Sequence, residues 1–105
     1  MQVVRRSSGW VVEVSGELDR MVAADLVGDV ARALGAEVAD VVIDLSHAEY
    51  LDGGGLHAID TCRTQCQAAG VQLSLADEMP PNVRRILALV GMDGLARPVV
   101  CVDDE

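Results

Sequence analysis

The segment that decides the fold reads DVVIDL and spans Asp40 to Leu45 in a chain of 105 residues. Its near-continuous apolar centre is typical of a β-strand that is covered on both faces. We therefore expect it to be the central strand of a sheet packed against helices.

On the N-terminal side of this strand, the pattern predicts a β-hairpin followed by a helix. Two runs rich in β-branched residues, 2–7 and 10–15, are separated by a Ser-Gly turn. Asp19 is the predicted N-cap of a helix over residues 20–34, in which apolar residues recur every three to four positions and which Gly35 ends.

On the C-terminal side, residues 46–54 are expected to connect the central strand to a helix over residues 55–69. Gly70 ends that helix, and residues 71–76 predict a strand. Two prolines at 80 and 81 favour the start of a third helix, where a missing N–H loses no intrahelical bond. Its expected apolar stripe consists of Val83, Ile86, Leu87 and Val90, and Gly91 is expected to end the helix.

A last short strand is predicted over residues 98–102, followed by an acidic end at 103–105. The order ββαβαβαβ predicts an α/β fold with a mixed, mostly parallel sheet. The length allows one domain, residues 1–105, with a core built from aliphatic side chains because Phe is absent.

The charge balance limits the classes of partner. Arginines alone supply the 8 cationic residues, and they face 17 acidic residues, so the formal net charge is −9. Such a field repels nucleic acid and anionic lipid. The longest apolar stretch, 86–92, is far shorter than the about 20 residues of a membrane span, so we expect no direct membrane insertion and a cytoplasmic chain.

Three cysteines, Cys62, Cys66 and Cys101, are an odd number in a chain large enough to fold without disulfides. We expect reduced thiols. Cys62 and Cys66 share the helix face that should point to the sheet, which favours a core position, and redox sensing stays open as the alternative.

The candidate functional segment is Asp52-Gly53-Gly54-Gly55, because functional groups in open α/β sheets gather where strands end and helices begin. One interpretation is a flexible turn with Asp52 as the helix cap. The other is an anion cradle made of free backbone N–H groups. Asp52 and the absence of lysine argue against a nucleotide loop of the usual kind.

Four motifs carry a resemblance that covers nearly the whole chain: GELD at 16–19, VIDLS at 42–46, LD at 51–52 with GL at 55–56, and VRRIL at 83–87 with Gly91. On these motifs the chain resembles a STAS domain, the fold of bacterial anti-sigma factor antagonists. The loop of that family usually reads Asp-Ser-Ser-Gly or Asp-Ser-Thr-Gly, and an anti-sigma factor that is a serine kinase phosphorylates the second hydroxyl residue. Here Gly53 and Gly54 fill both positions, so the resemblance predicts a module without a phosphorylation site at position 54.

The resemblance also implies an acidic partner-binding surface made of a loop, a turn and the helix that follows, and thus a partner rich in Arg and Lys. The candidate residues are Gly16, Glu17, Leu18, Asp19, Asp52, Gly53, Gly54, Gly55, Leu56, His57 and Asp60. Capping and turn formation are the alternative roles of Glu17 and Asp19.

His57 lies three residues before Asp60 on the predicted helix, so their side chains can meet. A general base or a pH sensor is one hypothesis for this pair, and an ordinary surface histidine is the favoured one. We expect no catalytic residue, metal site or cofactor.

The leading functional hypothesis is a regulatory module like an anti-sigma factor antagonist. Its partner would be an anti-sigma factor of the serine kinase type or another STAS-containing assembly. Two alternatives stay open: a STAS accessory subunit of a membrane transporter, and a small-ligand or nucleotide sensor that uses the glycine turn.

Overall fold

The computed structural model describes residues 2–5, 9–18, 20–35 and 40–97. In this part of the chain, strands and helices follow the predicted order ββαβαβαβ. They are β1 (Gln2–Arg5), β2 (Gly9–Leu18), α1 (Arg20–Gly35), β3 (Asp40–Leu51), α2 (Gly53–Ala69), β4 (Gln72–Ala76), α3 (Pro81–Leu89), a short 3₁₀ turn η1 (Asp93–Leu95) and β5 (Ala96–Arg97).

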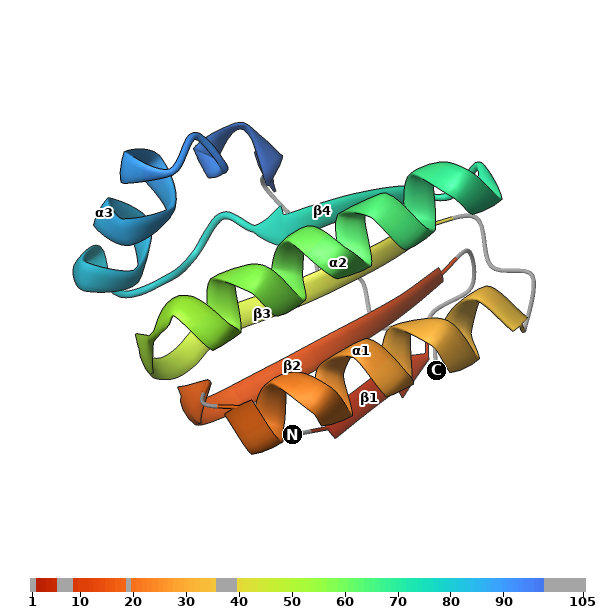
Figure 1. Cartoon of the computed structure of the whole chain (residues 1–105), viewed down its shortest axis with the longest axis horizontal. Coiled ribbons are helices and arrows are strands. Elements are labelled where there is room, and N and C mark those ends of the chain that lie inside the picture. Colours follow the sequence, from red (N-terminus) through yellow and green to blue (C-terminus); the bar gives the residue numbers. More distant parts are fainter. Residues whose placement is uncertain (1, 6–8, 19, 36–39, 98–105) are drawn as a thin grey trace.

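The strands form one five-stranded sheet in the order β1-β2-β3-β4-β5 (Figure 1). β1 pairs antiparallel with β2, and every later pair is parallel. The predicted mixed, mostly parallel sheet is therefore confirmed, with the DVVIDL segment in its centre.

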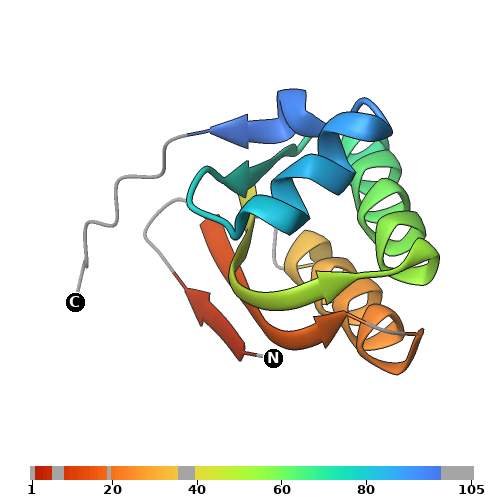
Figure 2. The ribbon, with the colours of Figure 1, turned by 90° about the vertical axis from the view of Figure 1, so that its left-hand side faces the viewer.

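Helices α1 and α2 lie side by side on one face of the sheet, and α3 lies beside the C-terminal part of β3 (Figures 1 and 2). The row Val12, Ile43 and Leu75 runs across three strands, and these side chains are fully buried. Along β3, buried residues alternate with the half-buried Val42 and Asp44. The expectation that this strand is covered on both faces is therefore wrong for the described residues, because α1 and α2 share one face.

Strand β3 runs on to Leu51, so residues 46–51 are strand and not the predicted connection. β2 extends in parallel with it, and Ser15 to Leu18 pair with His47 to Leu51 through an irregular register. Gly16 adopts φ 76°, a left-handed conformation that favours glycine and suits a bulge at this point. The backbone hydrogen bonds to β2 hold residues 46–51 extended, although their sequence only weakly predicts a strand.

The predicted helix ends mostly hold. Gly70 ends α2 at φ 72°, and Pro80 and Pro81 open α3. Val90 is wrong as a member of the buried stripe: α3 ends at Leu89, and the Val90 side chain is 51% exposed. The Asp19 cap and the strand predicted over 98–102 lie outside the described residues.

Candidate functional site

Two predicted site segments lie side by side at the C-terminal ends of the parallel strands. Gly16 pairs with Ala48, and Leu18 pairs with Leu51, so the end of β2 runs along the end of β3. Asp52 follows at once, and α2 begins at Gly53 (Figure 1). The pairing of β2 with β3 therefore places the 16–18 segment next to the 52–57 segment at the same end of the sheet. Asp19 lies outside the described residues.

Asp52 is the N-cap of α2. Its backbone is extended at φ −106° and ψ −174°, and its carboxylate accepts a hydrogen bond from the Gly55 N–H at 2.8 Å. The Leu56 N–H donates to the Asp52 carbonyl at 3.0 Å, which is the first intrahelical bond. The capping interpretation is confirmed. The cap disfavours an anion at this helix start, because the negatively charged Asp52 carboxylate already accepts a hydrogen bond from one of the N–H groups that an anion would use.

The glycine turn presents two of its three residues to solvent. Gly53 and Gly54 are exposed, as is His57 one turn later, whereas Gly55 is buried and Leu56 packs half-buried against the core. Backbone can approach another molecule closely where no side chain intervenes. At positions 53 and 54, the exposed part of the site is therefore backbone without side chains.

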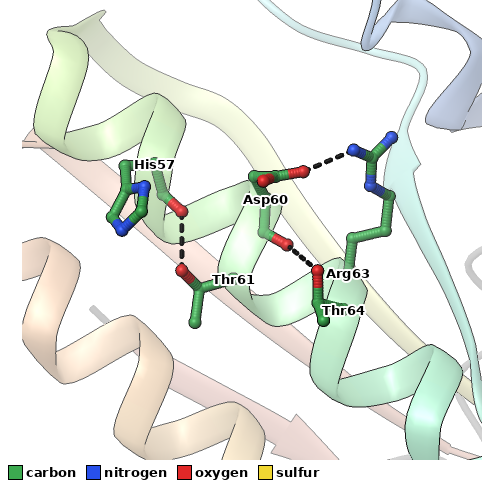
Figure 3. Close-up of polar contacts among 5 residues, drawn as sticks. All are labelled: His57, Asp60, Thr61, Arg63 and Thr64. Carbon is green, nitrogen blue, oxygen red and sulfur yellow. Dashed lines mark hydrogen bonds and ion pairs between the residues drawn. The ribbon is translucent and has the colours of Figure 1, made fainter.

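The contact between His57 and Asp60 that their spacing allows does not form. The Asp60 carboxylate accepts a hydrogen bond from the Arg63 guanidinium in an ion pair, and the His57 ring lies apart from it (Figure 3). Thr61 Oγ1 donates to the His57 carbonyl oxygen at 2.9 Å. Asp60 has His57 three residues before it and Arg63 three residues after it on the helix, and its carboxylate pairs with the guanidinium of Arg63.

A shallow apolar hollow of about 330 Å³ lies between α1 and α2 and was not predicted. Its lining residues are Ala23, Ala24, Val27, Gly54, His57, Ala58 and Thr61. The available signal was the concentration of Gly and Ala on the two helices. Which helix faces oppose one another depends on the packing of both on the sheet.

Cys62 and Cys66 are free, buried thiols on the sheet-facing side of α2. Burial, with a contribution from the neighbouring Cys66, raises the pKa of Cys62 to about 12, and burial also raises the pKa of Cys66. A thiol rather than a thiolate at neutral pH is a poor nucleophile. The core position is confirmed for both, and Cys101 lies outside the described residues.

The described residues contain no cluster of three or more His, Cys, Asp or Glu side chains that could hold a metal ion. None of the helices in that part of the chain is long and apolar enough to cross a membrane.

A family model described as "Mlab, STAS domain" matches residues 1–100. The chain belongs to the STAS domain family. The sequence motifs at 16–19, 42–46, 51–56 and 83–91 thus indicated the correct family.

Solved structures of anti-sigma factor antagonists share the fold of this STAS domain. The antagonist SpoIIAA in its unphosphorylated form superposes with a TM-score of 0.82 at 16% identity, over 95% of this chain and 88% of that chain. An anti-sigma factor antagonist from Mycobacterium paratuberculosis superposes with a TM-score of 0.74 at 27% identity, over 98% of this chain and 86% of that chain.

Sulfate transporters contain a segment similar to this STAS domain. The proteins of Equus caballus and Mus musculus are each 36% identical over 69 residues, which is 66% of this chain and 8% of each transporter. The chain therefore matches only a small part of the length of these relatives.

Proposed function

We propose that this STAS domain is a regulatory protein-binding module that acts like an anti-sigma factor antagonist. The observation that carries the proposal is the exposed Gly53-Gly54 backbone at the start of α2, anchored by the Asp52 cap and flanked by the end of β2. The similarity to the mycobacterial antagonist, at 27% identity over nearly the whole chain, supports it. The binding residues would be those of the 16–19 and 52–57 segments together with Asp60.

The partner would be a cationic protein surface, such as that of an anti-sigma factor of the serine kinase type. The chain carries a formal net charge of −9, and charge complementarity speeds encounter and sets specificity. Binding requires no catalytic group, and we propose a module that is not an enzyme.

Gly54 removes the phosphorylation switch from this surface. Without a hydroxyl at position 53 or 54, a serine kinase has no acceptor there, and no phosphoryl group adds its charge of about −1.5 to −2. The module would therefore bind its partner in one chemical state, whatever the ATP supply.

The test is calorimetry against the serine-kinase anti-sigma factors of the same cell, with and without ATP, followed by intact mass. We expect binding by the natural chain that ATP does not weaken. Gly54→Ser should gain one phosphoryl group and lose affinity with ATP, whereas Gly53→Ser, one residue earlier on the same turn, should not. Binding to none of these factors, or ATP-dependent release of the natural chain, would contradict the proposal.

A second candidate is an accessory module of a membrane transporter, which the similarity to part of the sulfate transporters favours. Copurification separates the two candidates. A partner recovered from detergent-solubilised membranes would favour the transporter role, and a kinase-type anti-sigma factor would favour the antagonist role.

A further inference from the structure

The hollow between α1 and α2 adjoins the exposed glycine turn, because Gly54 and His57 belong to its lining. The remaining lining is aliphatic except for Thr61, whose hydroxyl already donates to the His57 carbonyl oxygen. The hollow therefore offers an apolar surface with few free polar groups, beside residues that the proposed function already uses.

A second, polar recess adjoins the hollow on α1 and shares Ala24 with it. Its other lining residues are Asp25, Gly28, Asp29 and Arg32. Asp29 is paired with Arg32, and among the described residues the exposed Asp25 makes no ion pair. Two carboxylates against one guanidinium leave the recess with a net negative charge.

The two depressions together suit one kind of ligand. At about 330 Å³, the hollow lies at the small end of ligand pockets, which suits one or two aliphatic side chains better than a large cofactor. The neighbouring recess suits a cation that can face Asp25. On a helical segment, side chains three or four residues apart are neighbours and could reach adjacent depressions.

We propose that the α1–α2 hollow receives an aliphatic side chain of the protein partner, while an Arg or Lys of the same partner segment binds at Asp25. This inference rests on the proposed function, since it takes the partner to be a protein, and it adds α1 to the contact surface. Gly54 lines the hollow with backbone atoms alone, so a larger residue at this position tests whether the hollow receives the partner's side chain.

Gly94 provides the control for Gly54. It is exposed in η1, it lines neither depression and belongs to none of the proposed binding segments, and a Cβ built on it meets nothing within 4 Å. Gly54→Val therefore changes the lining of the hollow, whereas Gly94→Val makes the same chemical change away from it. Circular dichroism and thermal melting of both variants would show that they fold.

The experiment selects a displayed library of random helical peptides against the natural chain. We expect the enriched peptides to carry Leu, Ile, Val or Met three or four residues from Arg or Lys. Their dissociation constants should rise at least tenfold with Gly54→Val and with Asp25→Arg, and less than twofold with Gly94→Val.

Enrichment of neutral or acidic peptides, no enrichment, or equal effects of the two glycine variants would overturn the inference. A concentration-dependent dimer that Gly54→Val abolishes would assign the hollow to a second copy of the chain and would also overturn it. If the peptides behave as expected but no anti-sigma factor binds the natural chain, the proposed function alone is wrong.

Discussion

The Asp52 carboxylate accepts the backbone N–H of Gly55 at 2.8 Å and so closes the first turn of α2. This turn consists of three glycines, which are about 1 kcal/mol per residue less favourable in a helix than alanine. The cap offsets part of that cost. It also holds the Gly53-Gly54 backbone, which would bind the partner, in a defined conformation.

Replacing Asp52 by Ala should lower the free energy of unfolding by about 1 kcal/mol, within a range of about 0.5 to 2 kcal/mol, because the cap is lost. Asp52→Asn should retain most of the stability, since its side-chain oxygen can accept the same bond. Urea unfolding measures both changes. Asp25→Ala, at an exposed position in α1, is the control and should stay within about 0.5 kcal/mol. Equal losses for Asp52→Ala and Asp25→Ala would remove the capping argument.

Two glycine substitutions should change stability in opposite directions. Gly28 lies within α1 with open space around a built Cβ, so Gly28→Ala should stabilise the fold by about 0.5 to 1 kcal/mol. Gly70 also has open space, but its φ of 72° is unfavourable for residues with a side chain, so Gly70→Ala should destabilise by about 1 kcal/mol. Thermal melting compares the two. A lower Tm for Gly28→Ala, or a higher one for Gly70→Ala, would contradict the backbone argument.

The core beneath α2 should be sensitive to loss of volume. Ile59 is fully buried, so Ile59→Ala should cost about 2 to 5 kcal/mol through lost burial and the cavity left behind. Leu89 is 79% exposed at the end of α3, and Leu89→Ala should change stability by less than about 0.5 kcal/mol. Urea midpoints of the two variants test whether the helices pack on the sheet as described. A small effect at Ile59 would show that they do not.

Stability should fall as the pH rises above about 9, in part through Cys62. Its pKa rises from 9.0 to about 12 on folding, so between these values the unfolded chain has released a proton that the folded chain still holds. Folding stability then falls with pH, by roughly 1 kcal/mol per pH unit for one group. Between pH 9 and 10.5, urea unfolding of Cys62→Ala should show a shallower fall than the natural chain. Parallel curves for the two proteins would mean that Cys62 titrates normally in the folded state.

The same burial should protect Cys62 and Cys66 from alkylation. At pH 8 we expect iodoacetamide to modify them only slowly in the folded chain and rapidly after unfolding in urea, as followed by peptide mass spectrometry. Rapid labelling of both in the folded chain would restore the redox-sensor hypothesis.

The element order and most helix ends could be predicted from the sequence because they depend on local chemistry. The apolar run at 40–45 defines the central strand, Gly70 supports a left-handed helix end, and Pro81 suits a first helical turn. The role of Asp52 as a cap also follows from its side chain and its place directly before a helix. The signal for each of these features lies within a few residues of it in the sequence.

Contacts between distant segments decided the rest. Residues 46–51 are strand because β2 pairs with them. The α1–α2 hollow exists only where two helices pack on one sheet face with Gly and Ala between them. A sequence pattern records which side chains can interact, whereas the packing of the folded chain determines which of them meet.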